Sequence, residues 1–217
     1  MVLDSADIRL RPITQADRHT WRRVRQANAG WLGPWDATAP SRSYAQPRSF
    51  AAMVRTMRRE ARAGRQLPFV VEVDGVFAGQ LTVSNVLRGS AQFASIGYWI
   101  DEAYAGRGII TRAVAMAVDH CFGPVGLHRV EVAIRPENHS SLRVVEKLGF
   151  AEVGYAPRYL HIDGDWRDHR LFALTTEDVP GGLLRRFEER APEKPPGSSS
   201  RAPSEGPADG VPQQSQE

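Results

Sequence analysis

The segment that most limits the possible folds is a strand followed by a glycine-rich turn and an apolar helix. Residues 94–100 are β-rich, residues 105–108 read Ala-Gly-Arg-Gly, and residues 110–121 have an apolar helical pattern. Gly106 and Gly108 let main-chain amides approach a ligand closely. Amides at the start of a helix favour a phosphate. The spacing matches neither the dinucleotide nor the P-loop fingerprint, so anion binding and a simple turn into the helix are equally open.

Strand and helix patterns alternate along the rest of the chain. Strands are expected at 8–11, 69–73, 76–83, 94–100, 129–134, 151–155 and 170–174. Helices are expected at 14–29, 50–63, 110–121 and 136–149, with Thr14 and Ser49 as caps of the first two. An aromatic loop at 30–35 is broken by glycine and proline. This order predicts an α/β fold, with a mixed α+β sheet flanked by helices.

The composition changes near residue 191 of the 217-residue chain. The stretch 191–217 is rich in proline, serine and glycine and has no aromatic residue. Such a segment buries too little apolar area to offset its ordering entropy. The sequence therefore predicts one folded domain at 1–190 and a disordered tail at 191–217.

Charge and cysteine content exclude several classes of function. The net charge of +3 is too weak to indicate a nucleic-acid partner, although the arginine-rich surface favours ligands that carry phosphate. The single cysteine, Cys121, excludes an intramolecular disulfide and is expected to be packed in a helix rather than to act as a nucleophile. The six histidines lack metal-ligand spacing, so no metal is predicted.

The chain shows no pattern of membrane insertion or export. No apolar run approaches about 18–20 residues, and the first residues lack a basic region followed by an apolar one. We therefore expect a cytoplasmic protein without a membrane partner.

A second polar motif follows the strand at 129–134. It reads Arg-Pro-Glu-Asn-His-Ser-Ser, which places Asn138 and Ser141 at the start of a helix that ends at Gly149. Asn138 or Ser140 then serves either as a helix cap or as a ligand contact. From the residues alone, capping is the favoured interpretation.

Taken together, these motifs resemble the GNAT superfamily of N-acetyltransferases. The resemblance runs from Ile8 to Leu174 and rests on the order of Ile-Gly-Tyr-Trp-Ile, Gly-Arg-Gly-Ile, Arg-Pro-Glu-Asn-His-Ser-Ser and Glu-Lys-Leu-Gly-Phe. The opening Ile-Arg-Leu-Arg-Pro, the Trp-Leu-Gly-Pro-Trp segment and the late Asp-Gly-Asp-Trp-Arg-Asp-His are similar to the RimJ/RimL group. The resemblance implies a GNAT-like fold and acetyl-CoA as the cofactor.

The resemblance also implies roles for individual residues. The amides of Gly106, Arg107 and Gly108 would hold the pyrophosphate, and the main chain of Trp99 and Ile100 would pair with the pantetheine arm. Asn138 would hydrogen-bond the pantetheine, and Ser141 would donate a proton to the leaving thiolate. The remaining residues expected at the cofactor are Ala105, Ile109, Thr111, Arg143 and Lys147.

The chain departs from the family pattern at three positions. Ala105 stands where the family usually has Gln or Arg, Ile110 where it has Gly or Ala, and Ser95 where a glutamate often acts as base. The general base is therefore unassigned by the resemblance. Candidates are the polar residues of a late hairpin, where turn chemistry is the alternative. They are Asp163, Asp165, Asp168 and His169, of which Asp168 is chosen.

The acceptor site is expected on loops. Trp31, Leu32, Trp35 and Tyr159 are predicted to line it, with a hydrophobic plug as the alternative for the first three. The predicted reaction is direct attack, in a ternary complex, by the α-amino group at the alanine-like N-terminus of a ribosomal or other protein. A small-amine or antibiotic acetyltransferase and a non-catalytic CoA-binding, ribosome-associated module remain open. The protein is expected to be a monomer or a homodimer.

Overall fold

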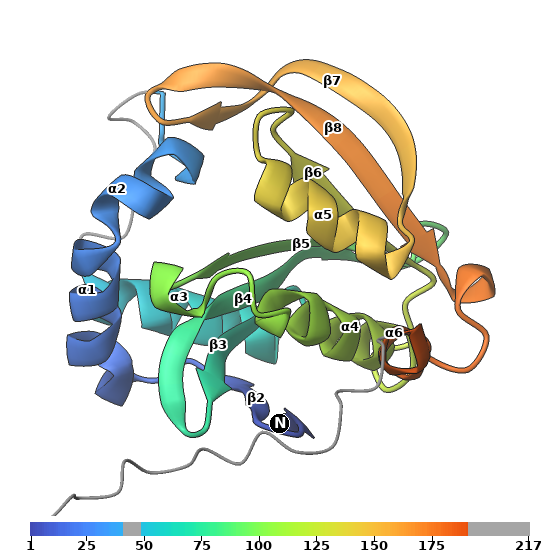
Figure 1. The fold of residues 1–217 in the computed structure, drawn as a ribbon, viewed down its shortest axis with the longest axis horizontal. Helices are drawn as coiled ribbons and strands as arrows, with labels where there is room; N and C mark the ends of the chain where they lie inside the picture. The colour runs from blue at the N-terminus through green and yellow to red at the C-terminus, as the bar shows by residue number, and fades with distance from the viewer. Residues whose placement is uncertain (41–48, 191–217) are drawn as a thin grey trace, which may run out of the picture.

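The computed structural model describes residues 1–40 and 49–190. These residues contain one eight-stranded mixed sheet with helices packed on it (Figure 1). The predicted tail at 191–217 lies outside the described residues. The strands are β1 (Leu3–Ser5), β2 (Ile8–Pro12), β3 (Leu67–Val73), β4 (Val76–Leu87), β5 (Phe93–Ile100), β6 (Arg129–Ile134), β7 (Ala151–Ile162) and β8 (Asp165–Thr175). Their order is β1-β2-β3-β4-β5-β6-β8-β7. Among these strands β5 and β6 pair in parallel and all other neighbours are antiparallel.

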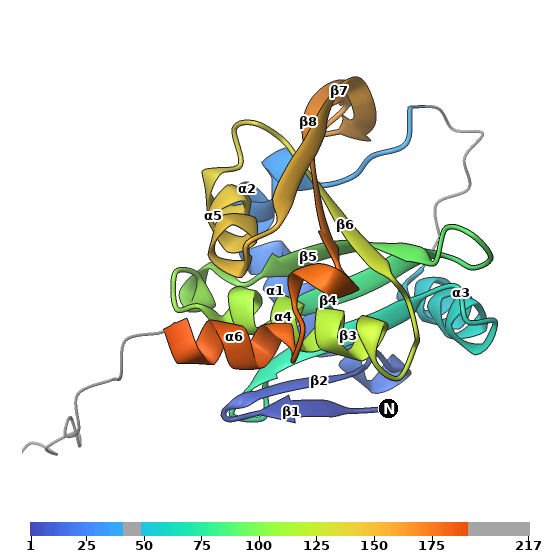
Figure 2. The ribbon, with the colours of Figure 1, turned by 90° about the vertical axis from the view of Figure 1, so that its right-hand side faces the viewer.

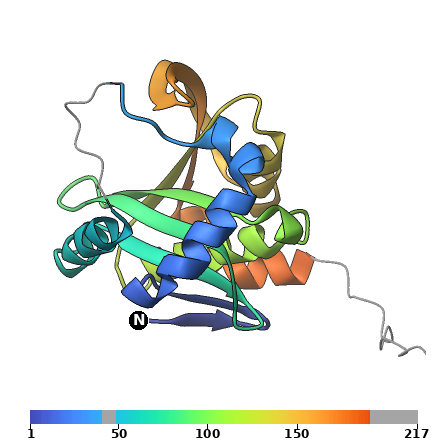
Figure 3. The same cartoon turned by 90° about the vertical axis from the view of Figure 1, so that its left-hand side faces the viewer.

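Helices cover both faces of the sheet, which confirms the predicted α/β fold (Figures 2 and 3). The helices are α1 (Arg18–Ala27), α2 (Ala29–Leu32), α3 (Phe50–Arg62), α4 (Ile109–Phe122), α5 (His139–Leu148) and α6 (Leu183–Arg190). Successive strand residues point to opposite faces. Accordingly Val71 packs in the core cluster shared with α4, α5 and α6, whereas Val70 packs with α1 and α3.

Helix α4 is the crossover between the two parallel strands. Parallel strands cannot be joined by a tight hairpin, so the chain must cross over the sheet between them. From Ile109 to Val118 every residue except Arg112 is buried. The small side chains of Ala113 and Ala117 let the helix lie against the sheet. The predicted apolar helix at 110–121 is confirmed with only small changes at its ends.

The aromatic segment 30–35 is helical instead of being the predicted loop, and α1 ends earlier than the predicted 14–29. The cause is Asn28, which is buried. Its side-chain amide donates to the Val24 carbonyl oxygen at 2.9 Å, which closes α1. Its own carbonyl accepts from Leu32 N at 2.9 Å and begins the single turn of α2. A 3-10 turn with Pro34 near its start follows at Gly33–Trp35.

Strands β7 and β8 are much longer than the predicted 151–155 and 170–174. They flank the predicted turn at Asp163 and Gly164, where φ is +49° and +76°. Most side chains of β7 are exposed, so no apolar alternation marks its full length. The tip of this hairpin reaches the segment that follows α2, where Ala37 bridges to Ile162.

Two elements, β1 and α6, have no counterpart among the predicted elements. Helix α6 packs beside α4 (Figure 2). The Asp119 carboxylate of α4 accepts from Leu183 N at 2.6 Å and from Leu184 N at 3.0 Å. Arg186 donates to the Leu148 carbonyl oxygen at 2.6 Å, at the end of α5. Helix α6 therefore connects α4 with the end of α5.

These contacts predict that Asp119→Ala lowers the free energy of unfolding by about 1–2 kcal/mol, because a lost helix cap typically costs this much. Urea unfolding would measure the change. Glu189→Ala on the exposed face of α6 is the control and should have little effect. Equal stability of Asp119→Ala and the wild type would contradict the capping role.

Candidate active site

The candidate site lies where β5 and β6 separate. The two strands pair from Phe93 with Arg129 to Ser95 with Glu131, and no pairing continues beyond this point. Strand β5 runs on to Ile100, so its main-chain groups on the β6 side are available to a ligand. The carboxyl ends of both strands, and the helices that follow them, meet at this opening (Figure 1).

One side of the opening is the glycine-rich turn before α4. Gly106 and Gly108 have φ values of +74° and +77°, in the left-handed region that favours glycine. A Cβ built at either residue meets no atom within 4 Å, so the space beside the turn is open. Gly108 caps the 14-residue α4. The turn therefore presents amides and the positive end of the helix dipole to the opening, which is the arrangement that binds phosphate.

The other side is the start of α5. The Asn138 Oδ1 atom accepts from Ser141 N at 3.0 Å, so the capping interpretation of Asn138 is confirmed. Because capping uses the oxygen, the amide NH₂ group of Asn138 remains to donate to a ligand. The cap also fixes the main chain at Ser141, on the first turn of the helix.

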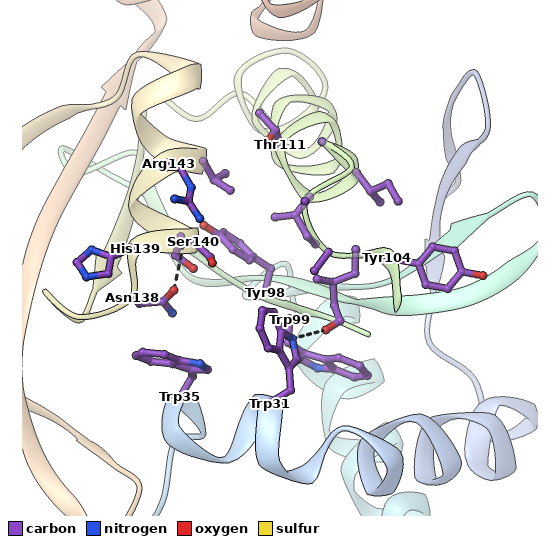
Figure 4. A pocket seen from close by; sticks show the side chains of 18 of the residues that line it. Trp31, Trp35, Tyr98, Trp99, Tyr104, Thr111, Asn138, His139, Ser140 and Arg143 are labelled. Atoms are coloured by element: carbon purple, nitrogen blue, oxygen red, sulfur yellow. Dashed lines mark hydrogen bonds between the residues drawn. The ribbon is translucent and has the colours of Figure 1, made fainter. Parts of the chain in front are cut away.

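A cavity of about 320 Å³ lies between these two helix starts (Figure 4). It brings together most of the residues predicted for the cofactor and acceptor. They are Trp31, Leu32, Trp35, Trp99, Ile100, Ala105, Gly106, Gly108, Ile109, Thr111, Asn138, Ser141, Arg143 and Lys147. Residues from four separated segments thus converge on one place, as a ligand-binding site requires.

The aromatic segment closes one end of this cavity and is tied to both of its sides. Trp31 Nε1 donates to the Ile100 carbonyl oxygen at 3.2 Å (Figure 4). The Arg135 guanidinium donates to the Pro34 carbonyl oxygen at 2.7 Å and lies over the Trp35 ring at 5.3 Å. The segment therefore spans the opening from β5 to the end of β6. It lines the cavity and also anchors the chain to the sheet, so it has features of both predicted alternatives, a site lining and a hydrophobic plug.

Arg107, Tyr159 and Asp168 are the predicted site residues that do not line the cavity. The Arg107 guanidinium stacks on the Tyr104 ring at 5.3 Å, so this residue contributes its main chain to the turn. Tyr159 is 47% exposed on the hairpin and meets the edge of the His169 ring. Tyr159 on β7 and Asp168 on β8 both lie outside the set of residues that line the cavity.

Asp168 has a structural part in that hairpin. Its carboxylate accepts from the Tyr155 hydroxyl at 2.5 Å and from Arg158 N at 2.7 Å, where Arg158 has a φ of +47°. These two hydrogen bonds lower the pKa of Asp168 below its usual value. A carboxylate that is engaged in this way and lies outside the cavity is a poor general base. The choice of Asp168 as the base is therefore not supported by the geometry.

The other hairpin candidates are also occupied by structural contacts. Asp163 forms the turn, and Asp165 pairs with Arg167 at 3.5 Å. His169 is buried, its Nδ1 atom lies 2.9 Å from the Arg167 carbonyl oxygen, and burial lowers its pKa.

A second cavity, of about 260 Å³, was not foreseen from the sequence. It shares Leu32, Trp35, Tyr98 and Trp99 with the first, and its remaining lining residues are Asp36, Ala37, Gln80, Thr82, Ser84 and Gly97. Gln80, Thr82 and Ser84 alternate along β4, so they lie on one face of the sheet. Gly97 and Trp99 alternate in the same way on β5, opposite Thr82 and Gln80. The alternation of these residues along β4 and β5 is the sequence signal from which this cavity wall could have been predicted.

The charged group at the second cavity is paired. Asp36 forms an ion pair with Arg25, whose guanidinium lies over the Trp99 ring at 5.2 Å and the Trp21 ring at 5.8 Å. Trp21 Nε1 donates to Gln80 Oε1 at 3.1 Å. The lining therefore mixes polar and apolar side chains, and its one charged residue among those described is paired.

Cys121 lies in the core at the far end of α4 and is fully buried. Burial raises the pKa of its thiol to about 12. The prediction that Cys121 is packed and does not act as a nucleophile fits this position.

Comparisons with known proteins agree with this geometry. The acetyltransferase (GNAT) domain family matches residues 7–151. The [ribosomal protein uS5]-alanine N-acetyltransferase of Escherichia coli is 34% identical over 174 residues, which cover 76% of this chain and 87% of that protein. The probable N-acetyltransferase YjcK of Bacillus subtilis is 40% identical over 105 residues, 48% of this chain and 58% of that protein.

Solved structures show the same fold. RimJ of Mycobacterium smegmatis, solved in complex with CoA-disulfide, superposes with a TM-score of 0.79 and 43% identity, and the match covers 84% of this chain and 88% of that one. The separated strands, the glycine-rich turn and the capped start of α5 thus occur within a shared domain. This chain belongs to the GNAT family of acetyl-CoA-dependent N-acetyltransferases.

Proposed function

We propose that this enzyme acetylates the α-amino group at the N-terminus of a protein, with an alanine-like first residue and a ribosomal protein as the leading candidate. The observation that carries the proposal is the second cavity, which meets the first at Tyr98 and Trp99 from the opposite face of the sheet. An acceptor chain bound there reaches the donor cavity through the gap between β5 and β6. The E. coli relative named for alanine of a ribosomal protein supports the same acceptor class.

The first cavity fits the acyl donor. The amides of Gly106, Arg107 and Gly108 would hold the pyrophosphate, and the main chain of Trp99 and Ile100, where β5 no longer pairs with β6, would hydrogen-bond the pantetheine arm. The Ile100 carbonyl oxygen already accepts a hydrogen bond from Trp31, so it is less available to the pantetheine arm. Residues that would add further contacts are Ala105, Ile109, Thr111, Asn138, Arg143 and Lys147. Acetyl-CoA supplies an activated thioester carbonyl.

The second cavity fits a peptide better than a polyamine. A polycation needs an acidic lining, whereas the acidic side chain at this cavity, Asp36, is neutralised by Arg25. The hydroxyls of Thr82 and Ser84 can hydrogen-bond a main chain. Gly97 is exposed and a Cβ built on it meets no atom within 4 Å, so a backbone can lie across this point.

The chemistry needs little help with deprotonation. An α-amine has a pKa near 7.7–8.0, so roughly a tenth of it is neutral at pH 7, far more than for a lysine side chain. A water relay suffices to remove the remaining proton. The buried Cys121 thiol is out of reach, so transfer is direct within a ternary complex. Ser141 donates its proton to the departing sulfur, and the proton released by the acceptor nitrogen restores the hydroxyl through solvent.

The proposal predicts acetylation of peptides that begin with alanine or serine, several residues long, with kcat/KM at least tenfold above that for spermidine or an aminoglycoside. Thiol release from acetyl-CoA and the mass of the product peptide would measure this. Turnover confined to small amines would contradict the peptide acceptor.

Ser141→Ala is expected to lower kcat about 10²-fold, the usual contribution of a general acid, with little change in the KM for acetyl-CoA. Steady-state kinetics and calorimetric CoA titration would separate the two effects. Ser140→Ala is the matched control, because it removes the neighbouring hydroxyl, which also lines the cavity, and leaves that of Ser141 in place. An unchanged kcat would remove Ser141 from the reaction.

Gly97→Val is expected to raise the KM for longer peptides about tenfold and to leave acetylation of alanine amide unchanged. Valine suits a strand, a Cβ at this position meets no atom within 4 Å, and Gly97 lines the second cavity. Comparing alanine amide with tri- and pentapeptides provides an internal control, and CoA affinity should stay constant. An equal rise in KM for alanine amide and for the longer peptides would contradict the proposed binding of the peptide across Gly97.

A further inference from the structure

The hydroxyl of Tyr98 is a buried polar group without a satisfied hydrogen bond. Its oxygen has no hydrogen-bond partner of standard geometry among the described residues. Tyr98 lies on β5 opposite Leu81, and its ring packs beside the main core cluster. Buried polar groups in proteins are nearly always paired, and each exception needs an explanation.

The position of this hydroxyl supplies the explanation. Tyr98 lines the donor cavity, and its side chain extends from β5 toward the first turn of α5 (Figure 4). Ser141 on that turn is the side chain whose hydroxyl the phenol approaches. The Asn138 cap fixes the main chain of Ser141 on this turn, and both Tyr98 and Ser141 line the donor cavity.

The two hydroxyls differ in acidity. Burial raises the pKa of Tyr98 to about 12, so the phenol stays protonated at neutral pH and can donate a hydrogen bond. An aliphatic hydroxyl is a much weaker acid than a phenol. When a serine gives its proton to a sulfur, negative charge develops on the serine oxygen. A hydrogen-bond donor next to that oxygen stabilises this charge and so makes the proton transfer easier.

We propose that Tyr98 is a positioning residue that donates a hydrogen bond to Ser141 Oγ and so aims the Ser141 proton at the departing sulfur. This inference rests on the proposed role of Ser141. As the acceptor nitrogen bonds to the carbonyl carbon, the C–S bond breaks and its electron pair goes to the sulfur. The sulfur takes the Ser141 proton, the proton lost by the nitrogen restores Ser141, and Tyr98 keeps its own proton throughout.

The test is Tyr98→Phe, alone and combined with Ser141→Ala. The single variant should lower kcat about tenfold while the KM for acetyl-CoA and the CoA affinity change less than twofold. In the Ser141→Ala background the same substitution should have almost no effect, because the two residues act as one unit. Tyr104→Phe is the control, since the Tyr104 hydroxyl points away from the cavity (Figure 4).

The variant should fold at least as well as the wild type, because it removes a hydroxyl that has no partner. An unchanged or higher melting temperature would therefore accompany the lower kcat. A purely structural role would instead lower the melting temperature and leave kcat alone, and that result would overturn the inference. Strictly additive effects of Tyr98→Phe and Ser141→Ala would overturn it too.

The leaving sulfur is the same for every acceptor, so the variants can be compared on any amine that the wild type acetylates. If the wild type acetylates small amines but no peptide, the proposed acceptor is wrong and the Tyr98 comparison still holds. If peptides are acetylated and Tyr98→Phe keeps full kcat, the inference about Tyr98 fails by itself.

Discussion

The separation of β5 from β6 is the constraint on which the rest of the site depends. Gly79 on β4 helps to explain it, because a Cβ there would lie 2.9 Å from Ile100 Cα and would clash with the Trp99 carbonyl oxygen. Glycine therefore lets the end of β5 lean onto β4 and away from β6. The parallel crossover places the starts of α4 and α5 at the resulting gap, and their amides and caps convert it into a binding site.

The gap also separates two cavities whose linings differ. The face that carries α4 and α5 presents main-chain amides and suits a phosphate-bearing donor, whereas the opposite face presents the polar row of Gln80, Thr82 and Ser84. The two cavities share Leu32, Trp35, Tyr98 and Trp99, whereas the polar row lines only the second cavity, so substitutions in that row can change the second cavity without touching a residue that lines the first. The aromatic segment bonded to Ile100 and Arg135 holds both edges of the gap at a fixed distance.

Local signals predict the two helix starts that border this site, while the roles of its residues came from the family resemblance. The left-handed glycines at Gly106 and Gly108 and the cap at Asn138 depend on neighbours within four residues, so the sequence shows them directly. The hairpin positions of Tyr159 and Asp168 depend on the length of β7, whose exposed side chains carry no apolar alternation. The second cavity was missed because it needs β4, β5 and the aromatic segment to be assembled.

Hydrogen-bond satisfaction separates the structural polar groups from the chemical ones. Asn28 is buried and engages Val24, Asp101 and Glu102. Buried Gln80 is held by Trp21, and the arginines with a buried unpaired Nε, Arg112 and Arg167, still pair through another nitrogen. The Tyr98 phenol has no such second contact.

That difference follows from function. A group whose partner belongs to the fold is already paired before any ligand binds, whereas a group that acts during a reaction must be left unpaired until then. The sequence can name Tyr98 as a cavity-facing strand residue by its alternation with Ile96 and Ile100. Only the assembled cavity, which Tyr98 and Ser141 both line, shows that this hydroxyl lies near Ser141 and has no structural partner among the described residues.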